Sequence, residues 1–233
     1  MRLHRFYVEQ PLGEEVVIDD VSLIKQWTKV FRYAAGDSVV LFNGDGRDIT
    51  YVLKNTGNKQ CLLSFSSSTA SYIPTKKITL FLSLIKKDNF ELVVQKATEL
   101  GVTTIVPLIS ERSEKKNLNE ERLCRIAMEA SEQCGRGDQP HISTIKTLNE
   151  AFHTLTENTS RLVLQMNGEQ ITTVIQKHTN DNPICFFIGP EGGWSTEEEE
   201  LFKKHNFKLV SLGNTVLRAE TAAIAACAAA LCC

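Results

Sequence analysis

The stretch that runs from Pro183 to Glu198 reads PICFFIGPEGGWSTEE. Its first part, up to Ile188, is apolar and predicts a strand, and the glycines that follow allow the backbone to approach a ligand closely. Pro190 stiffens this turn. The spacing from Ser195 to Glu198 is that of a capping box, which begins a helix. The stretch therefore predicts a strand, a glycine-rich loop and a helix in succession.

The same alternation of strands and helices extends to both sides of this stretch. Ile78–Ile85 is a nearly continuous apolar run, as expected for a strand buried on both faces. Asp88–Glu91 and Thr147–Glu150 have capping-box spacing and predict the starts of further helices. The other expected elements are strands at 102–108, 161–166 and 208–212, and helices that begin near 117, near 171 and at 220. Strands that alternate with helices predict a mainly parallel sheet covered on both faces.

Residues 1–72 have a different pattern, in which short strands are separated by closely spaced turns. Asn43–Gly46 predicts a hairpin turn, and Val21–Val30 predicts the one helix of this part. Ser66–Ser71 is a small-polar stretch typical of a linker. We therefore expect two domains, a small β-barrel over residues 1–72 and an α/β domain over residues 73–233.

The composition is that of an ordinary folded protein. Of 233 residues, 42% are hydrophobic and 23% are charged, and the net charge is −2. This balance excludes a disordered chain and excludes binding to nucleic acid by bulk positive charge, so RNA contacts would have to come from local patches. The cysteines form no C-x-x-C pair and the histidines are scattered, so no metal site is predicted. The longest apolar run, Thr221–Cys233, is too short to span a bilayer, and we expect a cytoplasmic protein without membrane association.

Three loops leave the carboxyl ends of predicted strands, where open parallel sheets bind ligands. They are Ile188–Trp194, Leu212–Thr221 and Leu164–Gly168. The first is neither a Walker loop nor a dinucleotide fingerprint. As a set, the loops offer backbone groups more than charged side chains, which suits a ligand with adenine and methionine parts better than a triphosphate. Taken alone, the glycine loop is equally consistent with a tight connection, and Glu220 with a helix N-cap.

The same loops resemble motifs of a known family. Ile188–Gly193, Leu212–Gly213 and Val216–Ala222 are similar to the C-terminal motifs of SPOUT methyltransferases, in particular of the bacterial 16S rRNA (uracil-N3)-methyltransferase family. The similarity extends to Gln95–Val102, Pro107–Leu108, Ser110–Ser113, Ala130–Arg136, Arg5–Val8, Val30–Arg32 and Gly36–Asp37. Two positions depart from it, because Phe31 stands where the family usually has leucine and Trp194 where phenylalanine is common.

This resemblance implies a PUA-like β-barrel that binds RNA, followed by a SPOUT α/β domain with a deep trefoil knot. It also implies a homodimer that binds S-adenosyl-L-methionine in the knot and methylates N3 of one uridine in the 16S rRNA of the 30S subunit. The cofactor-binding residues that it implies are Leu164, Gln165, Gly189, Pro190, Glu191, Gly193, Leu212, Gly213, Val216, Leu217 and Arg218. The small side chains of the last helix suit a segment that threads through a loop.

Methylation at uracil N3 requires that the N3 proton leave, so the site needs a base or a group that stabilises the anion. The expected catalytic residues are Arg218, as a stabiliser of charge on a uracil carbonyl oxygen, and Glu220, whose role as base or helix cap stays open. N3 lies on the base-pairing edge, so the target base must be unpaired or extruded. The residues expected to hold the RNA are Arg2, Arg5, Arg32, Arg112 and Arg136.

Three other functions are compatible with parts of the sequence. An RNA-binding module without catalysis would keep the fold, and 2′-O-ribose methylation within the SPOUT class would keep the cofactor as well. A nucleotide-dependent oxidoreductase is disfavoured because the dinucleotide fingerprint is missing. Only analysis of the reaction product separates base methylation from ribose methylation.

Overall fold

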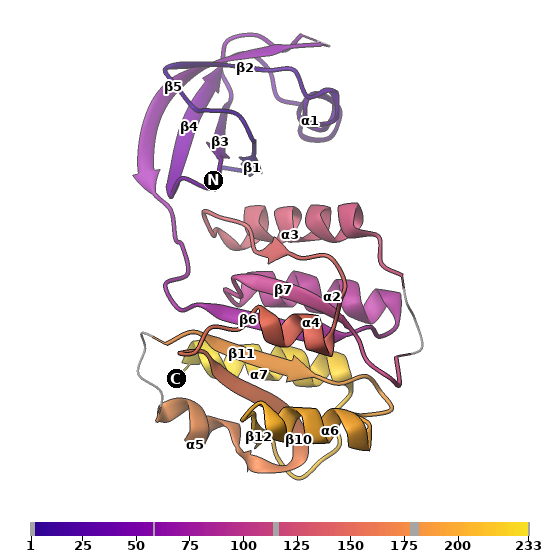
Figure 1. The fold of residues 1–233 in the computed structure, drawn as a ribbon. Coiled ribbons are helices and arrows are strands. Elements are labelled where there is room, and N and C mark those ends of the chain that lie inside the picture. Colours follow the sequence, from indigo (N-terminus) through magenta and orange to yellow (C-terminus); the bar gives the residue numbers. More distant parts are fainter. Residues whose placement is uncertain (1–2, 58, 114–116, 178–181, 233) are drawn as a thin grey trace. The chain divides into compact units, whose positions relative to one another are not determined.

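The computed structural model describes residues 3–57, 59–113, 117–177 and 182–232. They form two compact units, traced by colour along the chain in Figure 1. The N-terminal unit contains the described residues up to Ile73 together with Ser131–Asp138, and the C-terminal unit contains Pro74–Ala130 and the described residues from Gln139 onward. The expected boundary after residue 72 thus lies beside the observed one, but 131–138 belongs to the first unit and not to the second.

The N-terminal unit is built on a curled five-stranded sheet. Its strands are β1 (Arg5–Tyr7), β2 (Glu15–Ile18), β3 (Ser38–Phe42), β4 (Arg47–Leu53) and β5 (Cys61–Ala70), in the order β1-β3-β4-β5-β2. β1 and β3 run parallel, and the other neighbours run antiparallel. The predicted turn at Asn43–Gly46 connects β3 to β4 as a hairpin.

The helical segment of this unit contributes Ile24 and Trp27 to its core. α1 (Val21–Lys25) begins at Asp20, whose carboxylate accepts two backbone N–H groups of the first turn. It continues directly into η1 (Gln26–Phe31), a π-helix, so the predicted helix is confirmed but its second half is more widely wound. Trp27 of η1 is fully buried among apolar residues of the sheet.

The small-polar stretch after Phe65 forms a strand and not a linker. Ser66–Ala70 belongs to β5, and its last four residues pair with the first half of β4, with Ala70 opposite Arg47. The side chains of this half of β5 are exposed, so small polar residues are sufficient there, and the strand is maintained by its backbone hydrogen bonds. The expectation of a linker at 66–71 was therefore wrong for most of that stretch.

The C-terminal unit is built on a parallel sheet, as predicted. Its strands are β6 (Ile78–Ser83), β7 (Thr104–Ile109), β8 (His141–Ile142), β9 (Lys146–Thr147), β10 (Ser160–Gln170), β11 (Ile184–Ile188) and β12 (Lys208–Ser211). Their order is β12-β10-β11-β6-β7-β8, and β9 also pairs with β7. Each of these pairs is parallel.

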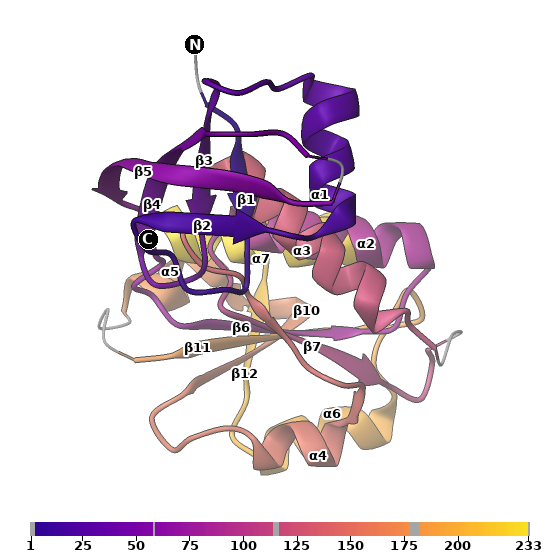
Figure 2. The same ribbon diagram turned by 90° about the horizontal axis from the view of Figure 1, so that it is seen from above.

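Helices cover both faces of this sheet (Figure 2). One face carries α2 (Lys87–Glu99), α3 (Glu120–Cys134), α5 (Ile171–Gln176) and α7 (Ala219–Cys232), and the other carries α4 (Leu148–His153) and α6 (Thr196–Lys204). The second face is aromatic: Phe81 and Phe187 stack with ring centroids 4.2 Å apart, and Phe152 and Phe202 pack around them.

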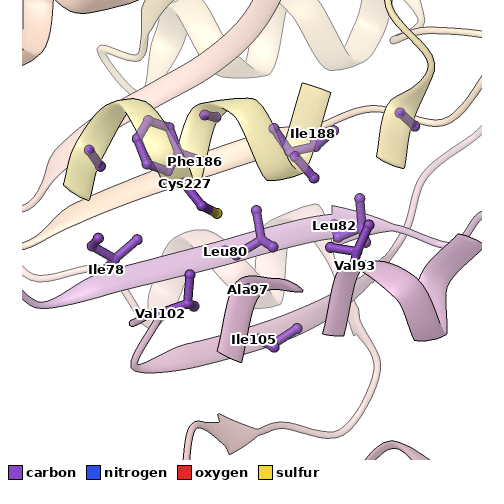
Figure 3. Close-up of a cluster of buried hydrophobic side chains, with 14 of the residues drawn as sticks. Ile78, Leu80, Leu82, Val93, Ala97, Val102, Ile105, Phe186, Ile188 and Cys227 are labelled. Carbon is purple, nitrogen blue, oxygen red and sulfur yellow. The ribbon is translucent and has the colours of Figure 1, made fainter. Parts of the chain in front are cut away.

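The completely buried positions of α7 carry small side chains. Ala223, Ala226, Cys227 and Ala230 of α7 are completely buried. Figure 3 shows the Cys227 side chain pointing from α7 towards Leu80 of β6, in a cluster that α2 and β11 complete. Small side chains allow the helix backbone to approach the sheet closely. Within the described part of the chain, neither α7 nor another helix is long and apolar enough to cross a membrane.

Two of the three predicted capping boxes named above are confirmed. Thr147 caps α4 with Glu150, and Ser195 caps α6 with Glu198. The box expected at Asp88 does not form, because α2 begins two residues earlier than such a cap requires and Asp88 lies inside the first turn. Glu91, its expected partner, is instead paired with Arg122.

Candidate functional site

A cavity of about 570 Å³ opens where β10, β11 and β12 end. These strands are parallel neighbours, so their carboxyl ends and the loops that follow meet at one edge of the sheet. The walls are formed by Leu164–Asn167, Ile188–Glu191, Gly193, Trp194, Glu199, Val210–Gly213, Thr215–Ala219 and Ala222. Most of these positions contribute apolar side chains or backbone.

The structure brings all of the predicted cofactor-binding residues to this cavity. Leu164, Gln165, Gly189, Pro190, Glu191, Gly193, Leu212, Gly213, Val216, Leu217 and Arg218 line it. Of the two predicted catalytic residues, Arg218 is at the wall, whereas Glu220 is not among the lining residues. Trp194 contributes to the wall and packs edge-on against Phe202, with ring centroids 4.8 Å apart.

A bulge in β10 forms one wall. Leu164 and Glu169 both pair with Val210, so residues 165–168 are extra on β10 and displaced from the ladder. Gly168 makes this possible, because a Cβ there would lie 2.5 Å from backbone atoms of Val210. The sequence predicted that a turn would end the strand at this point, but the strand resumes after the bulge and continues to Gln170.

Glu199 is a lining residue that the sequence reasoning missed. It lies in the first turn of α6, and its Oε1 accepts a hydrogen bond of 2.8 Å from Nε2 of Gln165 in the bulge. The contact joins the β10 loop to the helix that follows the glycine loop. The capping box at Ser195 could have indicated it, because it fixes where α6 starts and so places Glu199 beside the loop.

The glycine loop is held from its outer side by the segment that follows β7. Nη1 of Arg112 donates to the carbonyl oxygens of Gly192 (3.0 Å) and Trp194 (3.1 Å). Oε1 of Glu198 accepts from the backbone N–H of Glu111 (2.9 Å). Arg112 was expected to hold RNA; in the structure its guanidinium positions the loop that lines the cavity.

Arg218 and Glu220 lie on either side of the start of α7. The Arg218 side chain is 83% exposed, and its Nη1 is 4.0 Å from Oε1 of Glu220. Glu220 is buried in the first turn of α7, where the helix dipole favours a negative charge. Its Oε2 has no hydrogen-bond partner among the described residues. Glu220 is thus inside the helix and not at its N-cap.

Two of the arginines expected to hold RNA are buried within the N-terminal unit. Arg5 donates from Nε and Nη2 to the carboxylate of Asp48 (2.7 Å each), and from Nη1 and Nη2 to the carbonyl oxygens of Ser131 (3.0 Å) and Arg136 (3.1 Å). Arg136 is 2% exposed and donates to both oxygens of Asp138. These contacts hold 131–138 against β1 and β4, so neither guanidinium is presented to solvent as an RNA contact.

The other predicted RNA contacts have different positions. Arg32 is exposed at the end of η1, with a left-handed backbone (φ 58°). Arg2 lies outside the described residues.

No group of three or more potential metal ligands is found among the residues that the structure describes.

The parallel sheet, the small-residue helix α7 and the loop-lined cavity define the class: the fold resembles that of solved ribosomal RNA methyltransferases. Residues 72–231 match the RNA methyltransferase domain family, and the chain belongs to this family.

Its relatives match over almost the whole chain. The ribosomal RNA small subunit methyltransferase E of Rickettsia conorii is 30% identical over 235 residues, which is 98% of this chain and 95% of the relative. The crystal structure of this enzyme from Neisseria gonorrhoeae, bound to S-adenosylmethionine, is 29% identical, with a TM-score of 0.87 and coverage of 98% and 96% of the two chains. A methyltransferase from Legionella pneumophila, in complex with the same cofactor, is 31% identical with a TM-score of 0.87 and coverage of 97% and 96%.

Proposed function

We propose that this protein is an S-adenosyl-L-methionine-dependent methyltransferase that modifies N3 of one uridine in the 16S rRNA of the small ribosomal subunit. The observation that carries the proposal is the convergence of three separate loops, with every predicted cofactor-binding residue, on one cavity. Solved relatives of nearly the same length that hold this cofactor support it.

The cavity fits the cofactor in size and chemistry. Its volume of about 570 Å³ is within the range of small-molecule sites. Gly213 has a φ of 134°, and no atom lies within 4 Å of the place where its Cβ would stand, so its backbone faces open space that a ligand can occupy. Leu164 and Leu217 offer apolar walls to an adenine ring, and Glu191 and Glu199 are carboxylates suited to a cationic amino-acid part.

The residues of the chain perform the proton and charge work of the proposed reaction. When bound, S-adenosyl-L-methionine supplies an electrophilic methyl group. Arg218 stands at the cavity wall with an exposed guanidinium and stabilises the negative charge that forms on a uracil carbonyl oxygen as N3 loses its proton. Oε1 of Glu220 lies 4.0 Å from Nη1 of Arg218, so its carboxylate attracts that guanidinium. Glu220 is the carboxylate proposed to accept the N3 proton of the uracil.

The proposed architecture follows the family resemblance of the sequence. The curled sheet of the N-terminal unit corresponds to a PUA-like barrel that binds RNA, and the C-terminal unit contains a deep trefoil knot through which α7 is threaded. The small buried residues of α7 support this, because a threaded segment must fit a narrow space. We further propose that the protein acts in the cytoplasm as a homodimer.

The test uses 30S subunits from cells that lack this gene, purified protein and labelled S-adenosyl-L-methionine. Mass spectrometry of the nucleosides from digested 16S rRNA is expected to reveal N3-methyluridine at one position. Methylation on a ribose would overturn the stated reaction, and cofactor binding without transfer to these subunits would overturn the stated substrate. A protein that binds no cofactor in calorimetry would support a non-catalytic RNA-binding module instead.

A further inference from the structure

A surface cluster of aromatic rings lies where β1 begins and η1 ends. We call it the aromatic platform; its members are His4, Phe31 and Tyr33. The rings of Phe31 and Tyr33 are stacked, with centroids 5.5 Å apart and planes 17° apart, and His4 lies 4.3 Å from Phe31. Nδ1 of His4 and the hydroxyl of Tyr33 are hydrogen-bonded at 2.5 Å, which fixes the two outer rings. The platform is therefore an ordered set of rings.

The platform is attached to the core but is not part of it. Phe31 meets Phe6 edge-on at 5.7 Å, and Phe6 in turn meets Trp27, so the rings rest on the buried interior of the unit. His4 is exposed, and Phe31 and Tyr33 are only partly buried. Aromatic area that remains open to solvent on a rigid support is what stacking of a ligand ring requires.

Two cationic residues lie next to the platform in the sequence. Lys29 and Arg32 are exposed on either side of Phe31 in the sequence, and no ion pair of either is found among the described residues. Burial raises the pKa of Tyr33, and the carboxylate of Asp37 raises it further; that carboxylate accepts a hydrogen bond from the backbone N–H of Ala34. The surface thus combines exposed rings with cationic side chains.

The backbone that presents these residues is unusual. η1 is a π-helix, a form that is rare in proteins overall and is often found at functional sites. Arg32 adopts the left-handed conformation that few residues other than glycine adopt. Together they turn the chain sharply, so that Phe31 and Tyr33 lie on the same side although Arg32 separates them. Leucine at position 31 would keep an apolar side chain there without offering a ring.

We propose that the aromatic platform is a binding site for an unpaired RNA base, which stacks on Phe31 and its neighbours while Lys29 and Arg32 contact the flanking phosphates. The inference rests on the proposed RNA substrate and adds a site in the N-terminal unit, apart from the cofactor cavity. Aromatic side chains beside cationic ones are the common means of holding single-stranded nucleic acid, because every base has a face that can stack.

The test compares single-stranded with double-stranded RNA. Fluorescence anisotropy measures binding of labelled oligouridine of about 15 nucleotides and of an RNA duplex of equal length to the full-length protein. Phe31→Leu keeps the apolar contact with the core but removes the ring, so it is expected to weaken oligouridine binding by about 5- to 20-fold and duplex binding by less than about twofold. Phe65→Leu is the matched control, because Phe65 is an exposed aromatic residue of β5 outside the platform.

Charge and ring contributions are separable. Lys29→Ala and Arg32→Ala are expected to weaken both RNAs, with the salt dependence of binding reduced by about one unit of slope for each. Equal oligouridine affinity of Phe31→Leu and the wild type, or no binding of oligouridine by the wild type, would overturn the platform. Neither result would contradict the proposed reaction, which is tested separately by the detection of N3-methyluridine in 30S subunits. The platform would also be overturned if Phe31→Leu weakened duplex binding as much as oligouridine binding, because a paired base is not available for stacking on the platform.

Discussion

The cavity of the C-terminal unit and the buried arginines of the N-terminal unit, Arg5 and Arg136, use their polar groups in opposite ways. The cavity is lined by backbone and apolar side chains, and its one arginine, Arg218, is 83% exposed with a single carboxylate at 4.0 Å. Arg5, in contrast, has a 7% exposed side chain and donates to a carboxylate and to backbone carbonyls of 131–138. A group whose hydrogen bonds are used within the fold stabilises the fold, and a group that keeps them available can act on a ligand.

The strongest test of this comparison is removal of the Arg5 guanidinium. Arg5→Ala leaves Asp48 and the carbonyl oxygens of 131–138 without their donor in a mostly buried place. We expect the free energy of unfolding to fall by about 3–5 kcal/mol, measured by urea denaturation. Arg32→Ala, at an exposed arginine of the same unit, should change it by less than about 0.5 kcal/mol. Equal losses would contradict the comparison.

Removal of the Arg218 side chain should lower catalytic activity and leave stability nearly unchanged. Because its side chain is exposed, Arg218→Ala is expected to leave the melting temperature nearly unchanged, while kcat for methylation of 30S subunits falls about 100-fold. Calorimetry of S-adenosyl-L-methionine binding should reveal a much smaller change. If cofactor affinity fell as far as kcat, Arg218 would be a binding residue and not a stabiliser of charge.

The third variant tests whether the cavity depends on the close approach of β10 and β12. Gly168→Ala would place a Cβ 2.5 Å from the Val210 backbone, so the bulge must shift. We expect a loss of about 2 kcal/mol in the free energy of unfolding and an approximately tenfold weaker cofactor affinity. Gly13→Ala is the control, because its Cβ would meet only an ordinary contact at 3.9 Å. Unchanged affinity would indicate that the bulge does not shape the site.

The smallest effect is expected at an ion pair with the same geometry as that of Arg5 but with a half-exposed arginine. Arg122 donates to both carboxylate oxygens of Glu91 (2.6 and 2.8 Å), which holds the pKa of Glu91 below its usual value of 4.5. A lowered pKa in the folded state means that the contribution is present above that usual value and is lost as pH falls through the folded-state pKa.

Glu91→Gln is therefore expected to lower the free energy of unfolding at neutral pH by less than about 1 kcal/mol. The difference from the wild type should vanish in strongly acidic solution, as measured by urea denaturation across the acid range. A loss as large as that for Arg5→Ala would show that burial does not separate the two pairs.

The positions that could be predicted from the sequence are those fixed by strand ends. Once β10, β11 and β12 are parallel neighbours, the residues after Leu164, Ile188 and Leu212 must meet, so the lining of the cavity follows from local patterns. The bulge could not be predicted, because it depends on the distance between Gly168 and the backbone of Val210, a residue 42 positions later in the chain.

The roles of the arginines could not be predicted for a similar reason. Arg5 and Arg136 look like solvent-exposed charges in the sequence, and only the folded chain brings Asp48 to Arg5 from 43 residues away. The segment 131–138 begins inside α3, as its last turn, so nothing local indicates that it belongs to the N-terminal unit. The curled sheet is consistent with the expected barrel, and closure and the knot stay predictions.

The burial of Cys227 under α7 has a consequence for chemical labelling. Burial raises the pKa of its thiol, and that of Cys185, to about 12, so neither thiolate is available to an alkylating reagent in the folded protein. Cys124, Cys134 and Cys232 are exposed and should react at once. The slow reaction of Cys227 with a maleimide, followed by mass spectrometry, would then record how often α7 leaves the sheet, and bound cofactor should slow it.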